Sequence, residues 1–453
     1  MNTATETIDL KKTDAIAGLQ PGYFARRNLW DWIFAALVVA GGLYTYWLFS
    51  EYLDRYELGI LIGTVPSLIA LAWFWRPLRL LTVVVAVVSL LAVRLYQVDG
   101  VGMPERAEEV FLLKYLISSQ TAILWMSVMF IVSTFFYWLG VFSRKNADDF
   151  EYIGSKLAWA AVTFALVGFF VRWYETYLMG PGVGYMPVSN LYEVFILFAW
   201  LTAAYYLYYE DRYQTRRMGA FVMLIISASV GFLLWYTVTR EAHVIEPLVP
   251  ALQSWWMKVH VPANFVGYGT FAIAAMVGFA YLIKESAGHA SWWKLMPLWL
   301  VGSILVFEPF LFRRDVVEAG FYYWALYFGV SVLIVGGILS LRRRIADRLP
   351  SLEVMDDLMY RAIAVGFVFF TIATILGALW AAEAWGGYWS WDPKETWSLI
   401  TWLTYAAWLH MRLMKGMRGT VAAWWAIIGL AVTTFTFLGV NIFLSGLHSY
   451  GTL

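Results

Sequence analysis

The sequence predicts an all-α polytopic membrane protein, a transmembrane helix bundle of about 13 spans, on three observations. Hydrophobic residues make up 61% of the 453 residues and charged residues only 14%, whereas a soluble domain is about half apolar and a quarter charged. The apolar residues fall into runs of about 20, the length that crosses a bilayer core of about 30 Å.

The chain has no cysteine, which excludes disulfides, cysteine-ligated metals and thiol catalysis. A net charge of +1 gives no bulk attraction for nucleic acid.

Taken in order, thirteen segments have the length and apolar character of spans. Two of them are less apolar than the rest: one contains Glu308, and the twelfth is short and opens in a polar motif. The predicted transmembrane helices are residues 29–49, 57–75, 78–97, 119–142, 156–173, 189–208, 218–238, 263–283, 294–312, 321–341, 361–381, 396–412 and 421–442.

The orientation of the spans is predicted by lysine and arginine, which concentrate in every second connection, as in the run Arg342–Arg344. Cytoplasmic loops carry such an excess, so we expect a cytoplasmic N-terminus and an external C-terminus. The protein is then a multi-pass protein of the cell inner (plasma) membrane. Its longer loops, including 239–262 and 382–395, lie on the external, periplasmic face. Because the cytoplasmic loops are mostly short, chemistry is expected within the helices or on that external face.

Tryptophan is concentrated in the segment 380–408, which reads WGGYWSWDPKE from Trp385 to Glu395. One interpretation is the belt of indole rings that settles at the membrane interface, although a belt accounts for only one or two tryptophans per helix end. The other is a flat apolar platform with a polar edge, to which Asp392, Lys394 and Glu395 contribute. Such a surface suits a planar aromatic ligand with an anionic rim, a description that fits heme. The tryptophans in this segment are Trp380, Trp385, Trp389, Trp391, Trp397, Trp402 and Trp408.

Two of the five histidines share the predicted side of the membrane with this segment. His260 opens the helix 263–283 and His448 follows the last helix. Neutral imidazole is a common iron ligand, and two can hold one heme from opposite faces, so we expect His260 and His448 to be the axial ligands. His410 lies within a span, where a titratable group is costly and usually functional. His243 and His289 are interpreted as ordinary loop residues.

A further polar cluster, PVSNLYE, begins the helix 189–208. Asn190 and Glu193 are three residues apart and therefore lie on one helix face. A carboxylate that enters the apolar layer is expected to be paired or functional. Ser189 and Asn190 are equally typical of a helix N-cap. Both interpretations remain open from the residues alone.

Together these motifs resemble the heme-handling, tryptophan-rich (WWD) membrane family of cytochrome c assembly, in particular its CcsA/ResC type of the system II pathway. The resemblance covers about residues 156–453 and rests on four motifs in order. They are WGGYWSWDPKETW at 385–397, the two flanking histidines His260 in LQSWWMKVHV and His448 in GLHSYG, His410 in WLHMR, and the N-x-Y-E element at Asn190, Tyr192 and Glu193.

The resemblance implies that the protein binds heme b and presents it on the external face for thioether attachment to apocytochrome c at a Cys-x-x-Cys-His motif. The heme would rest on Trp385, Trp389 and Trp391, with Asp392 at the edge, and His410 would hold it transiently nearer the cytoplasmic side. A ResB-type membrane protein, a thiol-reducing protein and membrane lipid are the implied partners, and no nucleic acid is expected. The chain would then be a component of a cytochrome c synthase (heme lyase) complex.

The resemblance also divides the chain into additional transmembrane helices at 1–142 and an assembly core at 143–453, in which 294–312 and 321–341 look like an inserted helix pair. Two other functions stay open. One is a heme exporter or delivery protein of the system I type, without attachment activity. The other is an electron-transfer subunit that keeps heme b as a permanent redox group, although such subunits usually hold heme between histidines at membrane depth.

Overall fold

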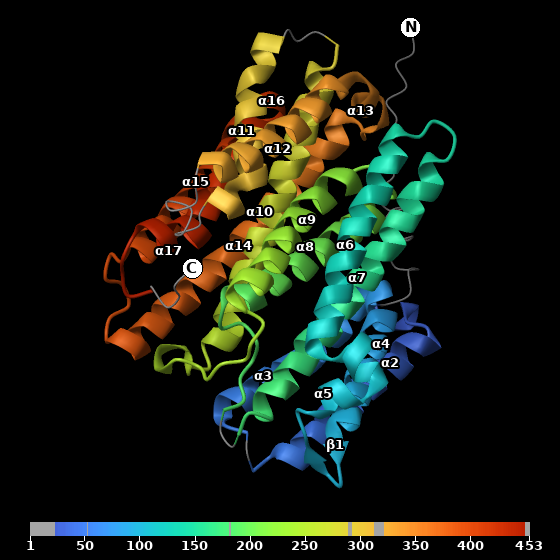
Figure 1. Ribbon diagram of the computed structural model, residues 1–453, viewed down its shortest axis with the longest axis vertical. Coiled ribbons are helices and arrows are strands. Elements are labelled where there is room, and N and C mark those ends of the chain that lie inside the picture. The colour runs from blue at the N-terminus through green and yellow to red at the C-terminus, as the bar shows by residue number, and fades with distance from the viewer. Residues whose placement is uncertain (1–22, 52, 181–182, 289–291, 312–320, 449–453) are drawn as a thin grey trace, which may run out of the picture. The chain divides into compact units, whose positions relative to one another are not determined.

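The computed structural model describes residues 23–51, 53–180, 183–288, 292–311 and 321–448, and these residues are predominantly helical (Figure 1). The strands among them are β1, Gln97–Val98, and β2, Val101–Gly102, which form a short antiparallel hairpin. The chain divides into two compact units, one up to Val83 and one from Val84 onward. The prediction of an all-α, multi-pass architecture is confirmed.

The first unit contains η1 (Phe24–Arg26), α2 (Leu29–Phe49), α3 (Arg55–Phe74) and the beginning of α4 (Pro77–Tyr96). Helix α2 begins with a capping box, in which the Asn28 side chain accepts a hydrogen bond from the Asp31 backbone N–H and the Asp31 carboxylate accepts one from the Asn28 backbone N–H. The buried Asp31 carboxylate also pairs with Arg79, at 2.9 Å. Such pairing is expected of a charge removed from water.

The second unit is built around α10, Met257–Ser286. In the most apolar stretch of this helix 94% of the residues are buried, and it packs against α8, α9, α14 and α16 (Figure 1). The other elements, in chain order, are α5 (Arg106–Glu109), η2 (Leu113–Ile117), α6 (Ser119–Phe142), α7 (Ala147–Tyr177), α8 (Leu191–Tyr213), α9 (Gly219–Arg240), η3 (Pro250–Leu252), α11 (Trp292–Leu311), α12 (Phe321–Ser340), α13 (Arg342–Arg348), α14 (Leu352–Trp385), α15 (Pro393–Lys415), α16 (Gly419–Thr434), η5 (Phe435–Gly439) and α17 (Val440–Phe443).

Each of the thirteen predicted spans overlaps a helix, and ten helices in the described part of the chain are long and apolar enough to cross a membrane. The three others are α11, α12 and the more polar α15. The count of thirteen crossings and the sides of the two termini stay predictions. So does the domain boundary after residue 142, which falls between α6 and α7, two helices that pack along each other.

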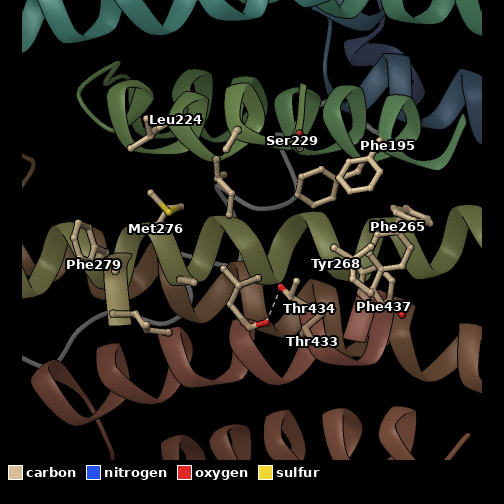
Figure 2. A pocket seen from close by; sticks show the side chains of 18 of the residues that line it. Phe195, Leu224, Ser229, Phe265, Tyr268, Met276, Phe279, Thr433, Thr434 and Phe437 are labelled. Atoms are coloured by element: carbon tan, nitrogen blue, oxygen red, sulfur yellow. Dashed lines mark hydrogen bonds between the residues drawn. The ribbon is translucent and has the colours of Figure 1, made fainter. Parts of the chain in front are cut away.

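The last predicted span is not one regular helix. Helix α16 passes into a widened π-helical turn, η5, before the short α17. π-helical turns are rare overall, and those that occur are frequently found at functional sites. The turn also borders an apolar cavity of about 100 Å³ between α8, α9, α10 and α16 (Figure 2). The rings of Phe265, Tyr268 and Phe437 gather at one end of this cavity, with ring centroids 5.2 to 5.7 Å apart. Tyr268 also lines the cavity described next.

Candidate functional site

A cavity of about 220 Å³ lies where α10 begins, α14 ends and α15 begins. Both predicted axial ligands, His260 and His448, line it, although they are far apart in the sequence. Trp389 from the tryptophan-rich loop and Lys394 from the first turn of α15 line it as well. The tertiary structure therefore brings the histidine pair and part of the tryptophan-rich segment into one place.

The orientation of His260 is set by a neighbouring helix. Its Nδ1 atom lies 2.8 Å from the carbonyl oxygen of Ala373 on α14. A carbonyl oxygen only accepts hydrogen bonds, so Nδ1 carries the proton and the lone pair is on Nε2. The side-chain amide of Asn264, one turn further along α10, donates to that Nε2 at 3.0 Å.

The close approach of α14 to His260 depends on a glycine. A Cβ atom added at Gly377 would lie 2.8 Å from Cε1 of the imidazole and 3.2 Å from its Nδ1. Real Cβ contacts are essentially never shorter than 3.0 Å. Because Gly377 has no side chain, the imidazole ring of His260 packs directly against α14 at this position.

The second imidazole, His448, is held by a carboxylate. Its Nδ1 lies 2.9 Å from Oδ1 of Asp392, and the backbone N–H of Leu447 donates to Oδ2 of the same residue at 2.6 Å. Burial opposes ionisation of Asp392, but hydrogen bonds from Lys394 N–H, His448 and Leu447 N–H outweigh it and lower the pKa of this carboxyl. Burial lowers the pKa of His448 and outweighs the attraction of Asp392. The neutral imidazole, the form that binds metals, is thereby favoured.

Asp392 also starts helix α15. Its side chain accepts a hydrogen bond from the backbone of Lys394 at 2.9 Å, and Glu395 accepts one from the backbone of Asp392 at 3.2 Å. Pro393 occupies the first helical position, which a proline tolerates because it needs no N–H partner there. The sequence DPKE is thus a capping box, and one carboxylate both begins the helix and orients His448.

The indoles of the tryptophan-rich loop do not lie in one plane. Trp391 has a positive φ of 60° and its ring is perpendicular to that of Trp389, at an interplanar angle of 88°. Trp391 is 69% exposed, whereas Trp385 contacts the His448 ring edge-on, with centroids 4.7 Å apart. Trp389 and Trp391 therefore do not share the flat platform expected from the sequence, and of these three indoles only Trp389 lines the cavity. Their contact with heme stays a prediction.

The remaining tryptophans of the segment have different surroundings. Trp380 lines the cavity and stacks on Trp385, with centroids 6.3 Å apart. Trp402 and Trp408 instead donate hydrogen bonds inside the helix bundle, to Thr371 and to the carbonyl of Ala422. The concentration of tryptophan in the sequence therefore combines a cavity lining with helix packing.

Two further histidines, His243 and His410, do not line this cavity. His410 has an exposed side chain near the far end of α15, so its predicted inner heme site stays a prediction. The backbone carbonyl of His243 accepts a hydrogen bond from the guanidinium of Arg172, at 2.7 Å. His289 lies outside the described residues.

The N-x-Y-E element forms a helix cap and a buried ion pair. Asn190 is the N-cap of α8 and accepts a hydrogen bond from the Glu193 backbone at 3.0 Å. The Glu193 carboxylate is 1% exposed and lies 2.8 Å from Nε of Arg172 on α7. Neither Asn190 nor Glu193 lines the histidine cavity. The geometry thus favours the capping interpretation, and an arginine within a predicted span was the available signal for the partner.

Several cavity residues were not anticipated. The most informative is Asn264, four residues after His260 and therefore on the same helix face; that spacing was a usable signal. Tyr388 and Asn441 also line the cavity. The contact between His260 and the Ala373 carbonyl could not be predicted from the sequence, because every residue has a backbone carbonyl.

Fold and site together define a polytopic membrane protein with a histidine-lined cavity beside a tryptophan-rich turn. A family model described as "Cytochrome C assembly protein" matches residues 188–448, which include both histidines and the tryptophan-rich segment. The chain belongs to this family, and its role is in cytochrome c biogenesis.

Curated relatives named "Cytochrome c biogenesis protein CcsA" are similar to most of the chain. The protein of Chlorella vulgaris is 33% identical over 328 residues, 72% of this chain and 94% of that protein. Those of Synechococcus elongatus and Gloeobacter violaceus are 36% and 34% identical, over 326 and 338 residues, 70% and 71% of this chain and 92% and 93% of those proteins. The resemblance inferred from the motifs is confirmed.

Proposed function

We propose that this protein binds heme b in the cavity between α10, α14 and α15, with His260 and His448 as axial ligands, and presents it on the external membrane face for attachment to apocytochrome c. Membership in the cytochrome c assembly family supports the handling of heme. In this reaction heme is the cargo, which passes from the chain to its acceptor.

One observation carries the proposal: each imidazole in the cavity has its Nδ1 on an oxygen acceptor, the Ala373 carbonyl for His260 and the Asp392 carboxylate for His448. Metal-ligating histidines almost always donate the second ring N–H in this way, which sets the tautomer and raises ligand basicity. Both rings are thereby prepared to bind iron through Nε2. The donor set of two neutral imidazoles is suited to heme iron.

The chain's contribution to attachment is positioning. Trp380, Tyr388 and Trp389 line the cavity and offer aromatic rings to the ligand. Apocytochrome c supplies two cysteine thiols, since this chain has none. Each thiol adds across a heme vinyl group. The S–H bond and the π bond of the vinyl C=C break, one S–C and one C–H bond form, and there is no net oxidation. Holding the vinyl groups near the thiols lowers the barrier by proximity. A ResB-type membrane protein and a thiol-reducing protein complete this proposed assembly.

The proposal is tested with the purified protein and with co-expressed apocytochrome c. Wild-type protein is expected to show a low-spin heme spectrum, and His260→Ala or His448→Ala to lose heme or to retain it only with added imidazole. His243→Ala, a histidine outside the cavity, is the matched control and keeps its heme. Unchanged heme content and covalent attachment in both cavity variants would overturn the ligand assignment. Co-expression with and without the ResB-type partner tests whether attachment needs it, and heme bound without any attachment would point to a delivery role.

A further inference from the structure

A lysine ammonium group projects into the same cavity as the two histidines. Lys394 lies in the first turn of α15, and its Nζ donates hydrogen bonds to the Phe437 carbonyl and to Oδ1 of Asn441, both at 2.9 Å. Phe437 belongs to the widened turn η5, and Asn441 to α17, which follows it. The irregular end of the last long helix therefore provides the acceptors that direct Lys394 into the cavity.

The charge of Lys394 is not neutralised by these contacts, because a backbone carbonyl and an amide oxygen are both uncharged. The two nearby carboxylates are engaged with backbone N–H groups: Asp392 with Lys394 and Leu447, and Glu395 with Ser390 at 2.7 Å. In the part of the chain that the structure describes, no ion pair involves Lys394. Burial lowers the pKa of Lys394 to about 7 against the attraction of the Asp392 carboxylate. An anionic ligand in this partly enclosed site would therefore stabilise the ammonium form.

We propose that Lys394 binds a carboxylate of the ligand held in this cavity. The inference rests on the proposed function, in which the ligand is heme and the carboxylate is one of its two propionates. An ammonium group has three donors, of which Phe437 and Asn441 take two. The third donor is left for an anionic group.

This contact gives heme an orientation that two axial ligands alone do not provide. Axial imidazoles hold the iron but let the ring rotate about the axis that joins them. A propionate bound to Lys394 stops that rotation, and the vinyl groups, which lie away from the propionates on the porphyrin, then face away from Lys394. Lys394 is therefore a positioning residue that determines which edge of the ring meets the thiols of apocytochrome c.

The test compares heme with its dimethyl ester, in which both propionates are uncharged but the iron and ring are unchanged. Dissociation constants for both ligands are measured on the purified wild-type protein, Lys394→Gln, Lys394→Arg and the control Lys114→Gln. Lys114 lies outside the cavity and pairs with Glu108 at 3.2 Å. Glutamine keeps hydrogen-bond donors without the charge, and arginine keeps the charge.

Wild type, the control and the arginine variant are expected to prefer heme over the ester by about 10- to 100-fold, the range for one hydrogen bond between charged groups. Lys394→Gln should lose that preference by weakening heme binding alone, and its unchanged affinity for the ester shows that the fold is intact. Equal weakening of both ligands, or a wild-type protein without preference, would overturn the assignment of Lys394. If wild type binds neither ligand, the proposed function itself fails.

Discussion

The Nδ1 atom of His448 lies 2.9 Å from Oδ1 of Asp392, the residue that begins helix α15. The final described residue of the chain is thereby fastened to the start of a helix more than fifty residues earlier. Gly446 permits this approach, because a Cβ atom at that position would lie 2.1 Å from Oδ2 of Asp392. One carboxylate thus connects helix capping, the path of the C-terminal segment and the orientation of an imidazole.

Replacement of this carboxylate by an amide separates its two roles. Asparagine is as good an N-cap as aspartate, so Asp392→Asn should leave the start of α15 nearly intact. It removes the anionic partner of His448, and heme affinity is expected to fall about 10- to 100-fold, as for other partners of metal-binding histidines. Heme titration and thermal unfolding in detergent measure the two effects.

Asp357→Asn is the matched control for this substitution, because Asp357 pairs with Arg361 at 2.8 Å, outside the cavity. It should leave heme affinity unchanged. A heme affinity that stays at the wild-type value in Asp392→Asn would mean that His448 does not depend on its carboxylate partner.

Gly377→Ala tests the packing behind His260. The added methyl group would lie 2.8 Å from Cε1 of the imidazole, so the ring must shift and its hydrogen bond to the Ala373 carbonyl is lost. The expected result is a loss of bound heme of about tenfold or more, given that misplaced catalytic or binding groups are costly. Gly337→Ala on α12, where nothing lies within 4 Å, should have no such effect, and equal effects would contradict this account.

Asn264→Ala tests how the hydrogen bond from Asn264 affects the ability of His260 Nε2 to bind iron. The Asn264 amide donates to Nε2 at 3.0 Å, so it competes with iron for the same atom. Removing one hydrogen bond that must break on ligation should strengthen heme binding by about 2- to 10-fold, from a net worth of about 0.5–1.5 kcal/mol. The measurement is the rate of heme release to an acceptor such as apomyoglobin. Faster release from the variant would show that Asn264 supports ligation.

Acidification should release heme with a midpoint below about 6.5, the ordinary pKa of histidine. Burial lowers the pKa of His448 in the folded protein. Such a group contributes stability that is fully present above its ordinary pKa and is lost as the pH falls through its lowered pKa. The lowered pKa of Asp392 acts in the same direction at still lower pH. Heme absorbance between pH 8 and pH 4 gives the midpoint, and release at pH 7 or above would contradict the burial of His448.

Much of the fold could be predicted because a helix that crosses a bilayer needs a long run of apolar residues, and such runs are visible in the sequence. Every backbone polar group must be satisfied within a span, so long apolar runs become helices, and all thirteen predicted segments overlap one. The boundaries were less well predicted. Helix α7 runs from Ala147 to Tyr177 and α14 from Leu352 to Trp385, both longer than the apolar stretches, because a helix continues beyond the bilayer wherever capping and packing allow.

By itself the sequence determined the multi-pass helical architecture, the family, and the two histidines and tryptophan-rich segment as the site to examine, because apolar length and motif spacing are local properties of the chain. Only the tertiary structure decided that Ala373 orients His260, that Asp392 holds His448, that Glu193 pairs with Arg172 and that Lys394 points into the cavity. These contacts join residues that are distant along the chain, and one is made by a backbone carbonyl. Only the packing of the helices selects such partners.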